Sequence, residues 1–232
     1  MSAQISAGDL ADREHTAPTS SLPIPRLSFV ADLVCPWCYL GFARLCRLST
    51  SIPVELVWHP FLLNPHLPVQ GVPRDLYLER KFGSAGAADK VYRRVVAAAE
   101  AEDLPIEPRR IRRQPNSVKA HALLLAAAST GRFLAMADAL FRAFFVEGRD
   151  VGSSAELQQI GLAVGLDRET VAEALAEPAS RAVWSAHDEA CRMGVNGVPL
   201  FVFGTGRTIA GAQPYEVLQE MLDLERYAVE CA

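Results

Sequence analysis

Two cysteines three positions apart are the residues with the clearest capacity for chemistry. Cys35 and Cys38 enclose Pro36 and Trp37, so the segment reads Cys-Pro-Trp-Cys. The apolar segment Leu27–Asp32 before the pair has the composition of a β-strand, and the residues after it have helical periodicity. Cys35 would therefore stand at a helix N-terminus, where unpaired N–H groups and the helix dipole favour a thiolate. Cys38, one turn further on, would be close enough to attack a mixed disulfide formed at Cys35.

Two other interpretations of the pair remain open from the residues alone. Buried cysteines pack as small apolar side chains, so the pair could belong to the core without reacting. A structural zinc site usually takes four ligands, and the chain holds no second Cys-x-x-Cys and no His-x-x-x-His. The order strand, Cys-x-x-Cys, helix favours a redox pair over both.

The chain has five cysteines, an odd number that argues against a scaffold held together by disulfides. Cys46 lies on roughly the same face of the expected helix as Cys38, and we expect it in the core. Cys191 could serve as a third redox thiol, but core packing is the favoured interpretation. Cys231 is expected to be exposed.

A proline that precedes a strand is the second chemical signal. The segment Gly194–Pro199 runs directly into Leu200–Phe203, which is typical of a buried strand. A proline at this position cannot donate a ladder hydrogen bond. A cis Val198–Pro199 bond would leave neighbouring backbone groups free for an extended substrate, whereas an ordinary trans proline at the start of a strand is the commoner arrangement.

These residues must be positioned by elements at both ends of the chain. At the N-terminal end, a helix that ends near Ser49 and a second strand, Val54–Phe61, follow the first strand. At the C-terminal end, Leu200–Phe203 and Thr208–Ala210 predict a hairpin, and Tyr215–Arg226 predicts a helix. The two ends therefore read βαβ and ββα.

Helical patterns fill the middle of the chain, and we expect them to form an inserted helical domain. The expected helices are Arg74–Phe82, Ala87–Glu102, Asn116–Ser129, Arg132–Glu147, Ser154–Val164, a short helix capped by Asp167, and Ala179–Met193. We expect a division into a disordered tail (1–25), a first thioredoxin-like part (26–63), the insertion (64–193) and a second thioredoxin-like part (194–232).

Several other polar residues are expected to be structural. His59 and His121 lie in apolar surroundings and are expected to be packed rather than catalytic. The basic run Arg109–Arg113 is expected to be a solvated loop. Ser153 with Glu156 has the spacing of a capping box.

Composition narrows the class of protein. Half of the 232 residues are hydrophobic, which excludes a disordered chain, and the net charge of −4 argues against binding nucleic acid through phosphate contacts. The longest apolar stretch, Leu33–Ala43, is too short to span a membrane. Residues 1–25 lack the features of a secretory signal, so we expect a cytoplasmic protein without membrane partners.

Six sequence blocks, taken in order, resemble the DsbA-like proteins of the thioredoxin superfamily, and most closely their FrnE-like branch. The blocks are DLVCPWCYLG (32–41), WHPFLLNP (58–65), NSVKAHALLLAA (116–127), ALFRAFFVEGRDV (139–151), GVNGVPLFVF (194–203) and IAGAQPYE (209–216). The resemblance implies an α/β fold, namely a thioredoxin fold interrupted by an inserted all-helical domain.

The resemblance also implies a role for each motif residue. Cys35 matches the nucleophilic cysteine of the family and Cys38 the resolving one. Pro199 matches the cis-proline opposite the sulfurs, and the backbone of Val198 would touch the bound substrate, with Pro36 and Trp37 beside it. Trp37 is a departure, because better-known DsbA proteins have histidine there, and it supplies no second cation near Cys35.

The sequence thus predicts a thiol–disulfide oxidoreductase or isomerase that acts on protein or small-molecule thiols and disulfides. Its redox element is the Cys35–Cys38 disulfide, with no metal and no bound organic cofactor, and glutathione is a candidate exchange partner. Two alternatives stay open. One is a glutathione-dependent isomerase or transferase that acts on a small aromatic or polyketide-like molecule, and the other is a non-catalytic binding module. The sequence does not specify the oligomeric state.

Overall fold

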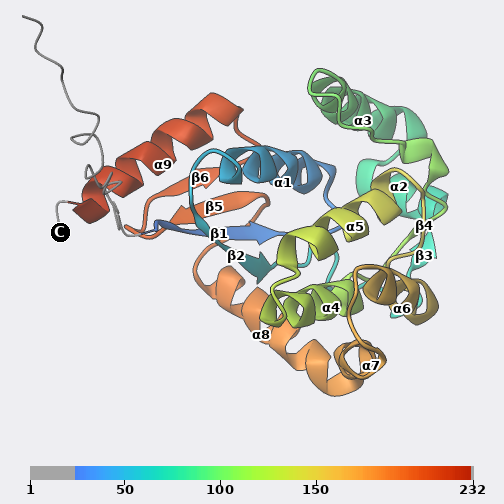
Figure 1. Cartoon of the computed structure of the whole chain (residues 1–232). Coiled ribbons are helices and arrows are strands. Elements are labelled where there is room, and N and C mark those ends of the chain that lie inside the picture. Colours follow the sequence, from blue (N-terminus) through green and yellow to red (C-terminus); the bar gives the residue numbers. More distant parts are fainter. Residues whose placement is uncertain (1–23, 231–232) are drawn as a thin grey trace, which may run out of the picture.

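The core of the fold is a mixed four-stranded sheet with helices on both faces (Figure 1). The computed structural model describes residues 24–230. The elements from the two ends of the chain are β1 (Arg26–Ala31), α1 (Pro36–Ser49), β2 (Glu55–Pro60), β5 (Leu200–Phe203), β6 (Thr208–Ala210) and α9 (Tyr215–Glu230). The strand order is β2-β1-β5-β6, with β1 parallel to β2 and antiparallel to β5. The expected βαβ and ββα units therefore meet in one sheet.

Strand β1 lies in the middle of this sheet. Its register pairs Phe29 with Trp58 of β2 on one side and with Phe201 of β5 on the other. Because α1 and α9 cover one face and α8 (Glu177–Arg192) the other, successive residues at the end of β1 are buried on both faces (Figure 1). The hairpin expected between β5 and β6 is confirmed, with Phe201 opposite Ile209.

Helix α1 packs close to the sheet, and a glycine allows the approach. A Cβ atom added at Gly41 would lie 3.3 Å from Cζ of Phe201, tighter than ordinary van der Waals contact. The same helix buries Phe42, Leu45 and Leu48. This contact fixes the position of the first turn of α1, which carries the cysteines.

The residues between the two halves of the sheet form seven helices in the part of the chain that the structure describes. The helices are α2 (Arg74–Phe82), α3 (Ala85–Glu100), α4 (Val118–Ser129), α5 (Phe133–Phe145), α6 (Ser154–Ala163), α7 (Arg168–Leu175) and α8. The thioredoxin-like fold with an inserted helical region is thus confirmed. The boundaries expected at 63/64 and 193/194 remain predictions, and residues 1–23 of the expected tail lie outside the described residues.

The insertion is not entirely helical, which corrects the all-helical expectation. Val72–Pro73 (β3) pairs antiparallel with Arg113–Gln114 (β4), and a short 3₁₀ helix forms at Pro108–Arg110. The basic run expected to be a solvated loop therefore contributes its last residue to a strand. Each of these strands has two residues, which is too short to produce a period-2 pattern in the sequence.

The three expected helix caps have different outcomes. Asp167 caps α7 as expected, accepting a hydrogen bond from the Thr170 N–H at 2.7 Å. Helix α4 begins at Val118, whose N–H donates to Asn116 Oδ1 at 3.1 Å, so Asn116 precedes the cap position. Helix α6 begins at Ser154 as expected, with Ser153 at the cap position, but the expected capping box does not form. The Ser153 side chain makes no cap hydrogen bond, and Glu156 accepts a hydrogen bond from Arg149 Nε at 2.6 Å.

Aromatic stacking joins the insertion to the redox helix. Tyr39 of α1 stacks on Phe141 and Phe145 of α5, with ring centroids 5.2 and 5.6 Å apart. Phe42 lies 5.4 Å from Phe141. A single buried cluster therefore runs from the sheet through α1 into the insertion.

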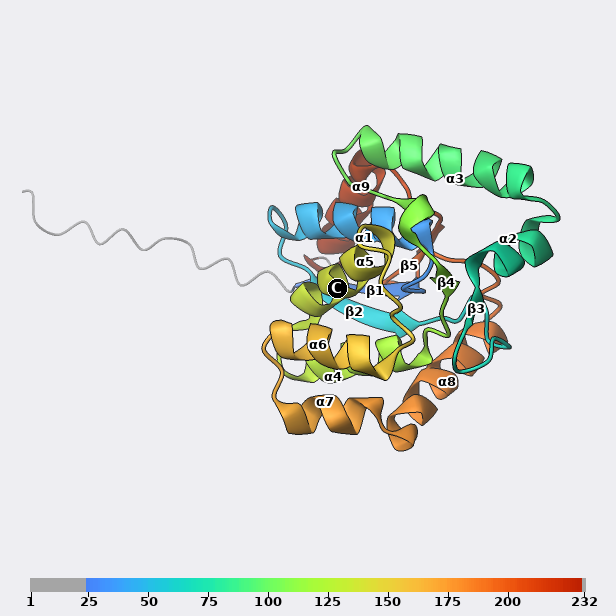
Figure 2. The same cartoon turned by 90° about the vertical axis from the view of Figure 1, so that its right-hand side faces the viewer.

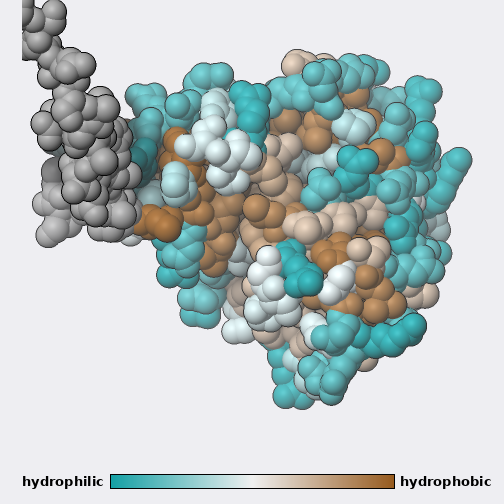
Figure 3. Space-filling model, in the orientation of Figure 1, coloured by the Kyte–Doolittle hydropathy of each residue, from teal (hydrophilic) through white to brown (hydrophobic). Residues whose placement is uncertain are grey.

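Hydrophobic residues are also found on the outer surface of the molecule. Figure 3 shows hydrophobic residues gathered in the middle of one face, over α5 and α6, with hydrophilic residues around them. Among the described helices, none combines the length and the apolar run needed to cross a bilayer.

Candidate active site

Cys35 and Cys38 occupy the first turn of α1. Cys35 is the N-cap residue with extended backbone, Pro36 is the first helical residue, and the N–H groups of Cys38 and Tyr39 both donate to the Cys35 carbonyl. Proline fits this position because its missing N–H would have had no helical acceptor. Cys35 is 5% exposed and Cys38 is fully buried, so Cys35 is the more accessible of the two thiols.

The two thiols differ in acidity. The pKa of Cys35 is lowered, chiefly because the Cys38 side chain donates a hydrogen bond to its sulfur, against the opposing effect of burial. Backbone N–H groups of Cys38 and Trp37 lower it further. Burial, together with the neighbouring Cys35, raises the pKa of Cys38 well above its ordinary value. Cys35 therefore ionises first, which suits it to be the attacking sulfur.

The proline loop lies opposite Cys35. The Val198–Pro199 bond is cis, and the Val198 carbonyl oxygen is 3.7 Å from Cys35 Sγ, within reach of the thiol proton. Pro199 is buried, whereas Val198 is partly exposed. The two sequence motifs, 163 positions apart, thus meet at one point, and the backbone beside the sulfur belongs to Val198 as the resemblance implies.

Pro36 and Trp37 line the accessible side of the turn. Both are half-buried, and Trp37 packs against the main hydrophobic core. Their role in substrate binding stays a prediction.

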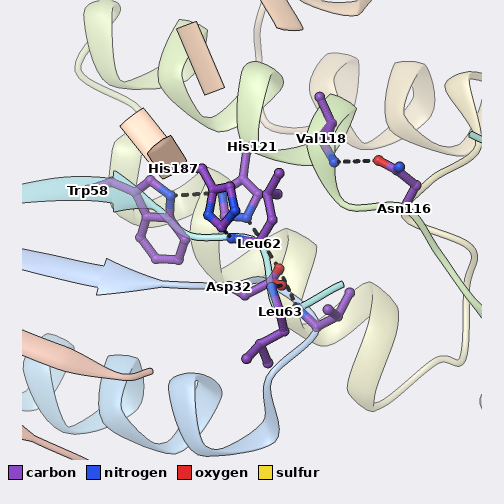
Figure 4. Close-up of polar contacts among 9 residues, drawn as sticks. Asp32, Trp58, Leu62, Leu63, Asn116, Val118, His121 and His187 are labelled. Carbon is purple, nitrogen blue, oxygen red and sulfur yellow. Dashed lines mark hydrogen bonds and ion pairs between the residues drawn. The ribbon is translucent and has the colours of Figure 1, made fainter. Parts of the chain in front are cut away.

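A buried carboxylate lies beneath the pair, in a network that sequence reasoning missed (Figure 4). Asp32 is fully buried, and its Oδ2 accepts a hydrogen bond from the Leu63 N–H at 2.7 Å. Its Oδ1 accepts from the Val34 N–H at 3.3 Å and lies 3.2 Å from Nε2 of His121. The charge of Asp32 raises the pKa of both Cys35 and Cys38. Asp32 is therefore coupled electrostatically to both sulfurs.

The protonation state of His121 follows from its second partner. Nε1 of Trp58 lies 3.0 Å from Nδ1 of His121, and an indole N–H can only donate. His121 Nδ1 must accept, so Nε2 carries the proton and donates it to Asp32. The expectation that His121 is packed in the core holds, since it is fully buried, but it is also the direct partner of Asp32. The sequence feature that could have indicated the role of Asp32 is its position, since it is an acidic residue at the end of a buried strand and three positions before Cys35.

A second histidine contacts the segment that directly follows β2. Nδ1 of His187 accepts from the Leu62 N–H at 3.2 Å (Figure 4). The His187 ring meets the Phe61 ring edge-on, with centroids 5.0 Å apart. Cys191 lies one turn further along α8, with Sγ 3.8 Å from His187 Nε2. The core packing favoured for Cys191 is wrong, because its side chain is exposed. Helix α8 buries His187 and Ala190, and Cys191 falls one position beyond that stripe.

The remaining expectations concern residues away from the pair. Cys46 is half-buried at the core margin, and burial raises its pKa to about 12. His59 is half-buried, and its Nδ1 has no hydrogen-bond partner among the described residues. Cys231 lies outside the described residues. Within residues 24–230, no group of three or more His, Cys, Asp or Glu side chains is arranged to hold a metal ion.

Comparison with known proteins adds a family to this geometry. A protein-family model described as a DSBA-like thioredoxin domain matches residues 26–223. A solved structure named as a probable DsbA oxidoreductase from Streptomyces coelicolor is 32% identical, with a TM-score of 0.76 over 87% of this chain and 89% of that one. No curated protein matches the sequence at a significant level.

Two more distant structures share the fold alone. A cytosolic disulfide reductase, DsbM, from Pseudomonas aeruginosa, solved with glutathione, is 21% identical with a TM-score of 0.60, over 89% of this chain and 98% of that one. A 2-hydroxychromene-2-carboxylate isomerase is 16% identical with a TM-score of 0.67, over 89% and 99% of the two chains.

Proposed function

Because the chain belongs to the DsbA-like thioredoxin domain family, we propose that it is a thiol–disulfide oxidoreductase whose redox pair is Cys35 and Cys38. The observation that carries the proposal is the divergence of the two thiols in one helical turn. The pKa of the more accessible Cys35 is lowered, and the pKa of the buried Cys38 is raised. An attacking thiol and a resolving thiol need this difference.

The chemistry follows from these positions. In the reducing direction, the Cys35 thiolate attacks one sulfur of a substrate disulfide, the substrate S–S bond breaks, and the leaving thiolate takes a proton from water. Cys38 then loses its proton and attacks the Cys35 sulfur of the mixed disulfide, releasing the second substrate thiol. Two electrons pass from the Cys35–Cys38 dithiol to the substrate, and the reverse sequence oxidises a substrate dithiol.

Val198 and Asp32 have different roles in this reaction sequence. The Val198 carbonyl, 3.7 Å from Cys35 Sγ, faces the position of a substrate strand and can accept a hydrogen bond from its backbone. Asp32, held by the Leu63 N–H and by His121, is the carboxylate coupled to both sulfurs and the acceptor we assign to the Cys38 proton.

A redox titration and a trapping experiment test the proposal. Equilibration with mixtures of reduced and oxidised glutathione should convert the Cys35–Cys38 pair in a single two-electron transition. The Cys38→Ser variant should accumulate a mixed disulfide at Cys35 that mass spectrometry can locate. Cys191→Ser is the matched control, because Cys191 is an exposed thiol away from the pair, and it should leave both results unchanged. A Cys35→Ser variant that retained disulfide exchange would refute the proposal.

A glutathione-dependent isomerase or transferase is the second candidate. The observation that favours this candidate is the cavity lined by Arg74 and Tyr92, because this cavity would accept a small organic acid. The complete cysteine pair favours the first candidate, because an isomerase of this kind needs no resolving thiol. Turnover of an aromatic substrate that survives Cys38→Ser would support the second candidate, and loss of exchange in the same variant supports the first.

We further propose that the protein belongs to the FrnE-like branch and works in the cytoplasm with glutathione as an exchange partner. The six sequence blocks support the branch. The cytosolic disulfide reductase of the same fold, solved with glutathione, supports the compartment and the exchange partner. Fractionation of cells that produce the tagged protein tests the compartment, and the reduction potential compared with the glutathione pool tests the direction of exchange.

A further inference from the structure

Asp32 joins the redox turn to the helical insertion. It follows β1 directly, and its carbonyl oxygen accepts a hydrogen bond from the Cys35 N–H at 3.1 Å. In both Figure 1 and Figure 2, α1 lies above the sheet and α4 below it. A residue at the end of β1 therefore lies between these two helices. The backbone of Asp32 contacts the redox turn, and its side chain contacts His121 of α4.

The Asp32 carboxylate is fully buried and depends on the donors around it. Its Oδ2 accepts a short bond from the Leu63 N–H at 2.7 Å. Its Oδ1 is less well satisfied, since the Val34 N–H at 3.3 Å is long for such a bond, and it relies on Nε2 of His121 at 3.2 Å. No lysine or arginine pairs with Asp32 in the part of the chain that the structure describes. A buried carboxylate stays charged only while such donors hold it.

Trp58 determines which proton His121 carries. The indole N–H points at Nδ1 from 3.0 Å, so it occupies the lone pair that a second proton would need. Trp58 is itself held in the core, with its ring edge-on to the rings of Phe29 and Phe141 at 5.6 and 6.2 Å. The imidazole is therefore kept neutral, with its one N–H directed at the carboxylate.

The other titratable groups around Asp32 are the two thiols. Cys35 and Cys38 face it from α1, and its charge raises the pKa of both. Helix α8 contributes His187, whose Nδ1 accepts a backbone N–H and which therefore brings no positive charge. Cys38 is fully buried, so its proton needs an acceptor inside the protein. The charged form of Asp32 is the acceptor that lies there.

We propose that His121 is a positioning residue, held by Trp58, that keeps Asp32 able to accept a proton. The insertion thereby controls the resolving attack of Cys38. The proposal rests on the proposed function and adds the control of its second step. In that step the Cys38 thiol gives its proton to the carboxylate, and its sulfur attacks Cys35 of the mixed disulfide. The bond between Cys35 and the substrate sulfur breaks, and the departing thiolate takes a proton from water, so both electrons come from the protein dithiol.

A coloured disulfide separates the two steps in the intact protein. The reduced protein is mixed in a stopped-flow instrument with one equivalent of a nitrobenzoate disulfide, whose released thiolate absorbs visible light. The first thiolate released reports attack by Cys35, and the second reports the resolving attack by Cys38. Loss of the second phase in Cys38→Ser assigns the two phases.

His121→Phe should slow the second phase about tenfold or more at neutral pH, the factor expected for one lost hydrogen bond to a buried charged group. Without this donor the buried carboxylate favours its protonated form, which cannot accept the thiol proton. The second phase of the variant should become faster as pH rises and Asp32 ionises, over a range in which the wild-type phase is constant. The first phase should not be slowed.

His121→Gln distinguishes a hydrogen-bond donor from a packed ring. Phenylalanine keeps the ring and loses the donor, whereas glutamine keeps an N–H donor and loses the ring. If His121 acts through its N–H, the glutamine variant should recover most of the rate and the constant pH profile. A role confined to packing predicts the reverse order of the two variants.

Trp58→Phe tests the fixed tautomer. With Nδ1 free, His121 can take a second proton, and an imidazolium against Asp32 weakens the tendency of the carboxylate to accept one. The second phase should match the wild type above neutral pH and decline below it, at higher pH than in the wild type. His59→Phe is the matched control on the same strand. Because His59 Nδ1 has no partner among the described residues, this change should alter neither phase.

The outcomes separate this proposal from the proposed function. A second phase that keeps its wild-type rate and pH profile in His121→Phe overturns the positioning role and leaves the proposed function standing. If that variant does not fold, a wild-type pH profile in Trp58→Phe overturns the role in the same way. A wild-type protein that shows no first phase, or a Cys35→Ser variant that retains it, overturns both.

Discussion

Asp32 connects the redox turn to the protein interior through single hydrogen bonds. One of its oxygens faces His121, the other accepts from Leu63, and its charge reaches both cysteines. The carboxylate works against ionisation of either thiol, because a negative charge nearby destabilises a second one. The acidity of Cys35 is therefore a balance between the helix turn and this residue.

Asp32→Asn should lower the pKa of both Cys35 and Cys38. The substitution removes a negative charge that raises both values and keeps the shape of the side chain. Ultraviolet absorbance of the thiolate and the rate of alkylation by iodoacetamide, each followed against pH, measure the change. Because the folded-state pKa of Cys35 is already depressed, its thiolate stabilises the reduced protein above the unfolded pKa, and that stability is lost as pH falls through the folded value. In the variant this loss should occur at lower pH.

Cys46→Ser provides the control for that titration. The pKa of Cys46 is raised to about 12 by burial, so this thiol should not contribute near neutral pH, and its removal should leave the curve unchanged. An Asp32→Asn protein whose curve coincides with the wild type would show that the carboxylate is not charged beside the sulfurs.

His121→Phe should destabilise the protein by about 1–3 kcal/mol for each buried group that loses its partner. The ring volume is nearly kept, but the Trp58 N–H loses its acceptor and Asp32 loses a donor. Urea unfolding followed by circular dichroism measures the loss. His59→Phe is the control, because His59 Nδ1 has no partner among the described residues and its removal should be nearly neutral. Similar losses in the two variants would contradict this assignment.

At the scale of elements, the β3–β4 pair holds the start of α2, and with it Arg74, in place. Gly71 precedes β3 with φ of 66°, and a Cβ there would lie 2.4 Å from the Gln114 carbonyl oxygen. Gly83, at the other end of α2, has φ of 79° with open space around it. The two glycines share a left-handed backbone and differ in what a side chain would meet.

Gly71→Ala should therefore be more destabilising than Gly83→Ala. Each substitution places a Cβ in the left-handed region, at about 1–2 kcal/mol, but only the first also forces two backbones apart. We expect the free energy of unfolding to fall by at least about 1 kcal/mol more for Gly71→Ala. Equal losses in the free energy of unfolding for the two variants would mean that β3 can move away from β4 at no energetic cost.

The sequence predicted those elements whose signals are local. Periodicity gave the sheet strands and most helices within a few residues, and Cys35 and Cys38 followed from their spacing and position. The β3–β4 pair was not predicted, because two-residue strands beside prolines have no hydrophobic periodicity. The pairing of Asp32 with His121 was not predicted because the two residues are 89 positions apart, and no local sequence pattern near either residue indicates its partner. The exposure of Cys191 depends on a shift of one position along α8, below the accuracy of a helical pattern.

At the scale of the whole molecule, α1 is shared between the sheet and the insertion. It packs on Phe201 of β5 at one side and stacks Tyr39 on Phe141 and Phe145 of α5 at the other. The insertion therefore supports the redox helix directly. Unfolding of one part should remove the support of the other.

Phe141→Ala should lower the free energy of unfolding by about 3–5 kcal/mol, because it removes a fully buried ring from that junction. The whole chain should still unfold in one transition, with circular dichroism and the reactivity of Cys38 changing together. Phe82→Ala, at a half-buried position at the end of α2, is the control and should have a smaller effect. Two separated transitions in the wild-type protein would show that the insertion is an independent unit.

The order in which the strands are synthesised affects how the sheet can form. Strand β1 is complete early, but its neighbour β5, which pairs Leu27 with Phe203, emerges only after the entire insertion has been made. Until then one edge of the central strand is unpaired, and Cys35 and Cys38 are synthesised long before the Val198 carbonyl that faces them. Contacts this distant form slowly and leave intermediates exposed. The nascent chain therefore carries a reactive dithiol before the Val198–Pro199 loop has been made. Correct folding of the nascent chain then depends on surroundings that keep this dithiol reduced.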